Sequence, residues 1–221
     1  MKLNDCHNFE DFRKLAKKKL PSPIFHYIDG GADDEVTLNR NTSSFNDYDL
    51  VPSVLNDVSN IDMSTTVLGE KIDFPLFPAA TAMHRLYHHE GERASAKATE
   101  KMGTIFGTST MGTVSIEEIA KVNKGPKLFQ LYIHKDRGLT DNLLERCKKA
   151  GFSSMCLTVD TVVAGTRERD RRTGFTTPPK LTLGSLLSFA LHPGWTINNL
   201  THEKFKLANI IHMTEKGTSI D

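Results

Sequence analysis

The sequence predicts an α/β fold with parallel strands, and a TIM (β/α)8 barrel is favoured over a doubly wound sheet. Short apolar segments alternate with amphipathic helical segments from residue 74 onward, as in strand–helix repeats. The predicted strands are residues 74–80, 104–108, 128–133 and 155–159. Their starts lie on the order of 25 residues apart, a spacing that suits both architectures. No Gly-x-Gly-x-x-Gly fingerprint follows any of these strands, and its absence favours the barrel.

A helix is predicted over residues 8–20, ahead of the repeats. Asn8 can cap its first turn, lysines 17–19 suit the negative end of the helix dipole, and Pro21 ends the helix. The chain is therefore expected to begin with a helical segment that precedes the barrel.

Three further helices are predicted between the strands, at residues 90–102, 115–121 and 140–150. The second of them opens with a capping box, Ser115 with Glu118. The strands themselves are apolar at successive positions, so both of their faces are expected to be buried by packing.

Residues 161–221 break this rhythm and are interpreted as a long excursion after the fourth strand, with a loop or insert at 168–221. An apolar patch at 181–191, together with Trp195, lies within it. Packing in the core or against another subunit is the default interpretation of the patch. Docking on a membrane surface is the alternative, because the patch is short, apolar and tipped by an aromatic residue.

Composition excludes several classes of protein. The chain has 221 residues and a formal net charge of +1, which argues against a dedicated nucleic-acid binder. The length falls short of the roughly 250 residues of a complete barrel. The three cysteines include no C-x-x-C pair, so reduced thiols in the cytoplasm are expected. The N-terminus has no apolar run typical of a signal peptide, and no stretch approaches the roughly 20 apolar residues that span a bilayer, so the cytoplasm is the expected location.

Polar residues stand at the carboxyl ends of all four predicted strands, where barrel enzymes place their active sites. They are Thr81, Ser109, Gln130 with Tyr132, and Thr158 with Asp160. Hydroxyl and amide groups suit a polar heterocycle better than a highly charged metal cluster. Each residue alone could be a cap or a turn residue, but their occurrence after every strand favours a binding site.

Two polar clusters receive a plainer interpretation. His84, His88 and His89 lie close in sequence, but no carboxylate completes a ligand set, so no metal is expected. The run 167–172 alternates basic and acidic residues, which is typical of a solvated loop for all of its members except Arg167.

Five ordered motifs resemble the FMN-dependent 2-hydroxy-acid dehydrogenase and oxidase family. They read FHYIDGGA at 25–32, ATAM at 80–83, EGE at 90–92, FQLY at 129–132 and TVDT at 158–161. TPPKL at 177–181 and HPGW at 192–195 look most like the respiratory L-lactate dehydrogenase branch. The resemblance implies that residues 1–221 are the first half or so of a TIM barrel domain. Relatives often have a proline where this chain has Val162 and Val163.

The resemblance also implies two sets of FMN contacts. The backbone that would line one side of the flavin ring belongs to Ala80, Thr81 and Ala82. The side chains that would hydrogen-bond the polar edge of the ring belong to Ser109, Gln130 and Thr158. Such bonds tune the electron affinity of a flavin.

The substrate contacts implied by the resemblance are Tyr27, Tyr132 and Arg167. A guanidinium can bind a carboxylate through two parallel hydrogen bonds, and a tyrosine can face the substrate hydroxyl. Asp160 would orient the catalytic histidine of the family. That histidine, a lysine beside the flavin, a second arginine and the phosphate loops belong to the family's C-terminal half. No Ser-Asn-His-Gly-type segment is found here, so we expect this chain to be an N-terminal fragment.

The function implied is oxidation of an L-2-hydroxy acid, with L-lactate giving pyruvate as the favoured reaction. The electrons would pass to a quinone or cytochrome. Two alternatives are a glycolate-type oxidase that makes hydrogen peroxide from oxygen, and an inactive half-barrel that serves only in assembly. At full length we expect a homo-tetramer without nucleic-acid partners, cytoplasmic or in peripheral contact with the inner face of the cell membrane.

Overall fold

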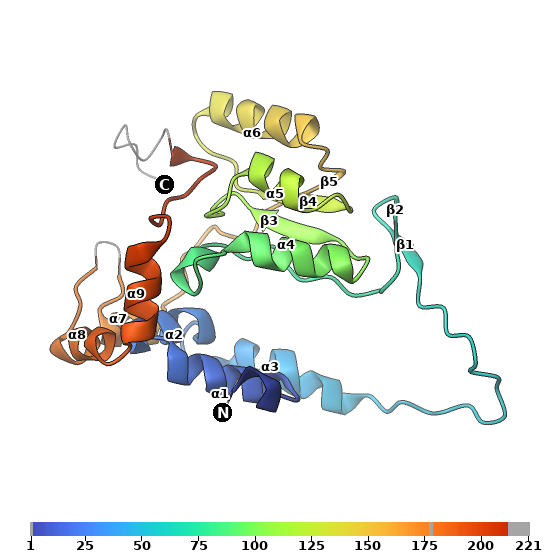
Figure 1. The fold of residues 1–221 in the computed structure, drawn as a ribbon, viewed down its shortest axis with the longest axis horizontal. Helices are drawn as coiled ribbons and strands as arrows, with labels where there is room; N and C mark the ends of the chain where they lie inside the picture. The colour runs from blue at the N-terminus through green and yellow to red at the C-terminus, as the bar shows by residue number, and fades with distance from the viewer. Residues whose placement is uncertain (1, 177–178, 212–221) are drawn as a thin grey trace. The chain divides into compact units, whose positions relative to one another are not determined.

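The computed structural model describes residues 2–176 and 179–211, and the chain divides into two compact units (Figure 1). The first unit comprises Met1–Asp57 and Val163–Thr201, and the second comprises Val58–Val162 and His202–Asp221. In the described parts, the second unit holds all the strands and the first is built from helices.

A three-stranded parallel sheet forms the centre of the second unit, in the order β3-β4-β5. The strands are β3 (Phe106–Ser109), β4 (Lys127–Leu131) and β5 (Ser154–Leu157). The unit also contains α4 (Glu92–Lys101), α5 (Ile116–Val122), α6 (Arg137–Lys149), the 3-10 turn η3 (His84–Leu86) and an antiparallel hairpin of β1 (Thr65–Val67) with β2 (Glu70–Ile72). Three of the four predicted strands and all three predicted helices between them are therefore confirmed, with ends that differ by a few residues.

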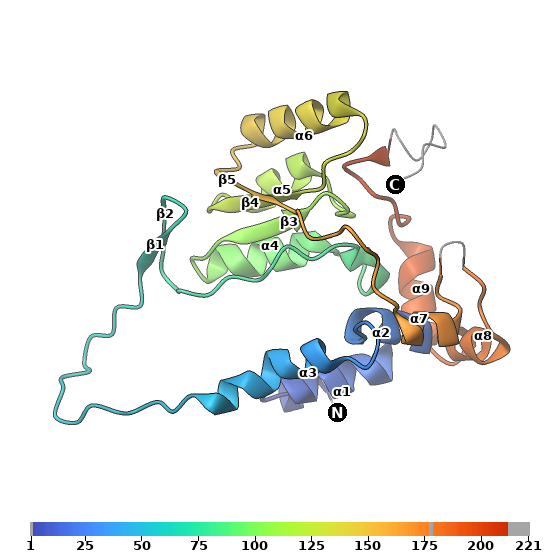
Figure 2. The same cartoon turned by 180° about the vertical axis from the view of Figure 1, so that it is seen from behind.

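Helices α4, α5 and α6 cover one face of this sheet (Figures 1 and 2). Phe129 and Leu131 of β4 pack with Ile116 of α5 and Leu143 of α6. Because side chains alternate along a strand, Leu128 and Gln130 face the opposite side. Leu128 does so in a separate cluster with Ile72 and Ile105. A doubly wound sheet would have helices on both faces. The one-sided cover is that of a partial barrel, as the sequence predicts.

The first predicted strand, residues 74–80, is wrong. None of these residues is in a strand, and the described pairing of this segment with the sheet is an isolated parallel bridge between Thr81, just after it, and Thr108. Pro75 and Pro78 interrupt the apolar segment. Proline has no N–H to donate to a strand ladder, so this segment cannot pair continuously.

The expectation that both faces of every strand are buried holds for β3 and β4 but is wrong for β5. All residues of β3 and β4 are buried. In β5, Met155 is 49% exposed and Leu157 is 44% exposed. The reason is position, because among the described strands β5 lies at the edge of the sheet and pairs with β4 alone.

The first unit contains the helix predicted at 8–20, which the structure confirms as α1 (Phe9–Lys19). The side chain of Asn8 accepts a hydrogen bond from the Asp11 N–H at 2.9 Å, so Asn8 caps the helix as expected. The unit further contains η1 (Leu3–Asp5), α2 (Ser22–Asp29), α3 (Val36–Ser43), η2 (Ser44–Asp47), α7 (Glu168–Thr173), α8 (Leu183–Ala190) and α9 (Pro193–Thr201).

The segment 168–221, predicted as a loop or insert after the fourth strand, contains α7, α8 and α9 in its described part. These helices belong to the same unit as the N-terminal helices. The backbone N–H of Ser22, at the start of α2, donates to Ser188 Oγ of α8 at 2.8 Å. The segment is therefore joined by hydrogen bonding to residues far away in the sequence. No helix in the described ranges is long and apolar enough to cross a membrane.

Candidate active site

Three of the predicted FMN-contacting side chains lie in one hydrogen-bonded row at the carboxyl ends of the parallel strands. Ser109 Oγ donates to Gln130 Oε1 at 2.7 Å, and Gln130 Nε2 donates to Thr158 Oγ1 at 2.5 Å. Ser109 is the last residue of β3 and is in register with Gln130 of β4. Thr158 directly follows β5, and its N–H bonds the Leu131 carbonyl. The prediction that these strands bring their polar ends together is confirmed.

The row consists of polar groups held where apolar packing would be expected. Ser109 is 2% exposed and Gln130 is 8% exposed. Buried polar groups need hydrogen-bond partners, and Ser109 and Gln130 satisfy one another. The hydroxyl hydrogen of Thr158 is left as a donor at the end of the row, because its oxygen accepts from Gln130.

The segment Ala80–Ala82 approaches the same end of the sheet on the other side of β3. Thr81 forms the bridge to Thr108, the residue before Ser109. A Cβ atom on Gly107 would lie 3.1 Å from the Ala80 nitrogen and 3.3 Å from its Cα. The absence of a side chain at Gly107 therefore lets the Ala80 backbone approach β3 closely.

These features fit a flavin. A row of hydroxyl and amide groups matches the alternating donors and acceptors on the polar edge of the ring, and small residues at 80 and 82 leave their backbone accessible to a flat ring. The residues that would hold FMN are thus Ala80, Thr81 and Ala82 on a face, and the Ser109–Gln130–Thr158 row at the edge.

Tyr132 and Asp160 follow the row by two residues each. The backbone N–H of Tyr132 donates to Thr110 Oγ1 at 3.1 Å, which fixes the chain just beyond β4. Tyr132 is half-buried and Asp160 is exposed. Both residues lie in the second unit, after the strands that carry Gln130 and Thr158.

Tyr27 and Arg167 lie together in the first unit. The Arg167 guanidinium carbon is 5.1 Å from the centre of the Tyr27 ring, a cation–π contact. Nη1 of Arg167 donates to the Gly30 carbonyl at 3.0 Å, Nη2 donates to the Tyr27 carbonyl, and Nε donates to Asp170 at 2.5 Å. Each nitrogen of the guanidinium therefore has a partner within the chain. The placement of this pair beside the FMN residues of the other unit stays a prediction.

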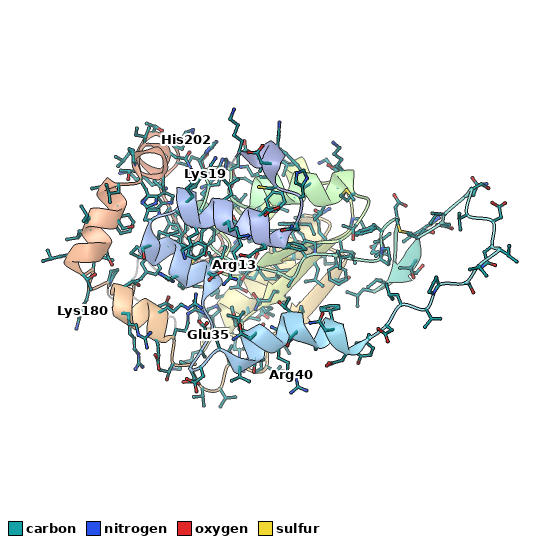
Figure 3. The ribbon with its side chains drawn as sticks, turned by 90° about the horizontal axis from the view of Figure 1, so that it is seen from below. Arg13, Lys19, Glu35, Arg40, Lys180 and His202 are labelled. Carbon is teal, nitrogen blue, oxygen red and sulfur yellow. The ribbon has the colours of Figure 1, made fainter. Side chains whose placement is uncertain are left out.

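Sequence reasoning missed the ion pairs around Asp29. Arg13 donates to both carboxylate oxygens of Asp29, and Arg169 donates to Asp29 and to Glu35. Figure 3 labels Arg13 and Glu35, the two outer members of this group. The Arg13 guanidinium, by its hydrogen bonds, lowers the pKa of Asp29. The interpretation of 167–172 as a solvated loop is wrong for Arg169, which is paired, and for Asp170, which is buried in α7. Alternating charge along the sequence could not reveal partners about 140 residues away.

Sequence reasoning singled out His84 only as part of a histidine cluster and missed its contacts. Its Nε2 lies 2.5 Å from Thr81 Oγ1, and its Nδ1 lies 3.3 Å from Ser95 Oγ. Burial lowers the pKa of His84, and the nearby carboxylate of Glu92 offsets part of that effect. His89 instead stacks on His202 with ring centres 3.9 Å apart. In the ranges that the structure describes, no group of three or more His, Cys, Asp or Glu residues is arranged to hold a metal ion.

Comparison with known proteins agrees with this geometry. The sequence profile of the FMN-dependent dehydrogenase family matches residues 16–219. Glycolate oxidase of Spinacia oleracea is 44% identical over 176 residues, which are 80% of this chain and 48% of that protein. L-lactate oxidase of Nostoc sp. is 46% identical over 187 residues, covering 83% of this chain and 51% of that protein.

Solved structures give the same result. The crystal structure of (S)-mandelate dehydrogenase, described as a monotopic membrane protein, matches with a TM-score of 0.87 at 32% identity. That match covers 96% of this chain and 58% of the other. The chain spans about half the length of the curated relatives that it matches. With a family profile that covers almost its whole length, the chain belongs to the FMN-dependent dehydrogenase family.

Proposed function

We propose that the protein catalyses the FMN-dependent oxidation of an L-2-hydroxy acid to a 2-keto acid, with L-lactate as substrate and pyruvate as product. The observation that carries this proposal is the Ser109–Gln130–Thr158 row beside Ala80–Ala82, in a chain of this family. The similarity to L-lactate oxidase supports lactate, and the similarity to glycolate oxidase supports a small 2-hydroxy acid in general.

The chain's residues are proposed to bind and orient FMN and the substrate. Bound FMN would supply the acceptor for the hydride from the substrate's α-carbon. Ser109, Gln130 and Thr158 hold the polar edge of the ring and fix its in-plane orientation. The backbone of 80–82 closes one face, so the substrate approaches from the other. Hydrogen bonds to the ring edge favour extra electron density there and so make the flavin a better oxidant.

Tyr27, Tyr132 and Arg167 are proposed to bind the substrate. Arg167 suits a carboxylate because its planar guanidinium can make two parallel hydrogen bonds. To do so it exchanges the carbonyls of Tyr27 and Gly30 for the substrate's oxygens. Tyr132 is proposed to face the substrate hydroxyl, and Asp160 to orient the histidine that takes the hydroxyl proton.

Reduction of bound flavin tests the proposal. Protein expressed from its complete coding sequence should purify yellow, and anaerobic addition of L-lactate should bleach the visible absorption of FMN. D-lactate is the matched control, because it differs only in the hand of the reacting carbon. Colourless protein, or holoprotein that no L-2-hydroxy acid bleaches, would refute the proposal.

We propose a quinone or cytochrome as the electron acceptor, with oxygen as the second candidate. The similarity to glycolate oxidase and L-lactate oxidase favours that second candidate. Hydrogen peroxide formed per pyruvate during aerobic turnover separates the two. A ratio near one supports the oxidase, and a ratio near zero with rapid reduction of a soluble quinone supports the dehydrogenase.

Peripheral membrane contact is proposed for α8 and α9. Residues 181–201 contain no Asp, Glu, Lys or Arg, and leucines 183, 187, 191 and 200 are 87%, 61%, 69% and 79% exposed. Large exposed apolar patches mark interaction sites, and short apolar helices can lie in a bilayer interface. The monotopic membrane nature of the related mandelate dehydrogenase supports this choice over the subunit contact of a tetramer.

Co-sedimentation with vesicles containing phosphatidylglycerol tests the membrane contact. Replacing Leu183 and Leu187 together by serine should abolish sedimentation, while the same exchange at exposed Leu50 and Leu55 of the first unit should not. Loss of a tetramer in the α8 double variant, with unchanged vesicle binding, would assign the patch to subunit packing instead.

A further inference from the structure

The segment proposed to line the FMN ring is tied to the rest of its unit through His84. Met83, between Ala82 and His84, has a left-handed backbone conformation with φ of 58°. That conformation is unfavourable for a residue with a long side chain, so surrounding contacts must hold it in place. The turn at Met83 sends the chain back on itself, and the His84 ring reaches Thr81.

His84 connects Thr81 to α4. On one side of its ring, Nε2 contacts Thr81 Oγ1 at 2.5 Å, and on the other, Nδ1 contacts Ser95 Oγ at 3.3 Å. A neutral imidazole has one donor and one acceptor nitrogen, so it can bond both hydroxyls at once. A protonated ring has two donors and no acceptor.

Glu92 anchors the backbone of the same turn. Its side chain is fully buried, and Oε1 accepts from the His84 N–H at 3.3 Å. The same carboxylate accepts from the Thr113 N–H at 2.9 Å and from the Thr113 hydroxyl at 2.6 Å. Thr113 lies in the loop between β3 and α5. The turn at 83–84 is thus bonded to α4 and to the loop beyond β3, which are both parts of the packed unit.

We propose that His84 is a positioning residue for FMN: through Thr81 it fixes the backbone of Ala80–Ala82 against the flavin ring. This inference rests on the proposed FMN site. His84 itself acts through Thr81. Loss of the His84 side chain would let the Met83 turn relax and displace the backbone that lines the ring. That displacement would change the FMN affinity, the visible absorption and the midpoint potential of the flavin.

Two isosteric variants divide the two contacts of the ring. In His84→Gln the side-chain amide nitrogen occupies the place of Nε2 and keeps the bond to Thr81. In His84→Asn the amide nitrogen occupies the place of Nδ1, which keeps Ser95 and loses Thr81. His84→Asn should bind FMN about tenfold more weakly, the loss of roughly one hydrogen bond. It should also shift the visible absorption and the midpoint potential of the flavin. His84→Gln should remain near wild type in all three measurements.

The matched control is His7→Asn, which changes an exposed histidine of the other unit and should alter none of them. Equal FMN affinity, spectrum and potential in both His84 variants would overturn the proposal. So would equal losses in both variants, because a role in stability alone does not distinguish the two contacts.

A measurement on the wild type covers the case in which His84→Asn yields no soluble protein. FMN titrated into apoprotein with ¹⁵N-labelled histidine should move the ring resonances of His84, assigned by their absence in His84→Gln. Resonances that stay unmoved at saturating FMN would overturn the proposal. Wild-type protein that binds no FMN would refute the proposed function as well, whereas FMN-binding wild type with unresponsive His84 variants would refute the positioning role alone.

Discussion

Replacing Gln130 by methionine removes the centre of the polar row while nearly conserving side-chain volume. Gln130 is 8% exposed, and its amide bonds Ser109 at 2.7 Å and Thr158 at 2.5 Å. Methionine is flexible and apolar, so it can fill the same space but can make neither bond. The exchange therefore separates hydrogen bonding from packing.

The structure sets the expected magnitude. A typical hydrogen bond contributes about 1 kcal/mol net, and a buried group left without its partner costs about 1–3 kcal/mol. Ser109 is 2% exposed and loses the acceptor for its hydroxyl, whereas half-buried Thr158 can turn to water. We expect a loss of about 2 kcal/mol in the free energy of unfolding. For a chain of this size that loss lowers Tm by about 4–8 °C.

FMN affinity should fall in parallel. If the Gln130 amide bonds the ring edge, its removal weakens FMN binding by about one to two hydrogen bonds, or roughly 5- to 30-fold. Thermal unfolding followed by circular dichroism and quenching of FMN fluorescence give the two numbers. Asn142→Met, an exposed polar-to-methionine exchange on α6, is the control. A Gln130→Met protein with unchanged Tm and unchanged FMN affinity would show that the row has no structural or binding role.

Three further predictions concern Gly107, three buried or half-buried histidines, and the cysteines Cys147 and Cys156. Gly107→Val should destabilise the protein by about 1–3 kcal/mol and weaken FMN binding, because its side chain would displace the backbone of Ala80; normal FMN titration and unfolding curves would contradict this. The free energy of unfolding should fall as the pH is lowered below 6.5. Burial lowers the folded-state pKa of three histidines, so the unfolded chain binds more protons than the native one in that range. Urea titrations at pH 5.5 and 7.5 test this, and equal unfolding midpoints would contradict it. These histidines are His26, His84 and His134. Burial raises the pKa of Cys147 to about 12, so native protein at pH 8 should be alkylated by iodoacetamide at exposed Cys156 and spared at Cys147, as peptide mass analysis would reveal.

The sequence was sufficient to predict the part of the fold that depends on local pattern. Apolar runs bounded by turn residues located β3, β4 and β5, and the rule that parallel strands end at one edge placed Ser109, Gln130 and Thr158 together. The strand predicted at 74–80 failed because its apolar character outweighed Pro75 and Pro78 in the interpretation, although proline is the stronger local signal.

What the sequence could not show depends on contacts between distant residues. Ion pairs of Arg169 with Asp29 and Glu35 join positions more than 130 residues apart, and no local pattern encodes them. Helix α8 would have been easier to predict from the sequence, because Thr182 precedes an apolar run, a typical helix start. In the structure Thr182 caps the helix by accepting a hydrogen bond from the Ser185 N–H. The pairing of Tyr27 with Arg167 was expected only through the family resemblance, and their placement beside the predicted FMN contacts stays a prediction.

If Arg167 binds the substrate carboxylate as proposed, its hydrogen bonds to the Tyr27 and Gly30 carbonyls bear on which anions it selects. Main-chain oxygens that occupy a guanidinium compete with every incoming acid for it. A ligand can bind through Arg167 only in the fraction of molecules in which both carbonyl hydrogen bonds are broken. The apparent dissociation constant therefore equals the intrinsic one divided by that fraction. A monodentate anion gains too little binding free energy to displace two acceptors, whereas a carboxylate can replace both at once. Internal competition of this kind would discriminate against chloride and other monodentate anions without any steric filter.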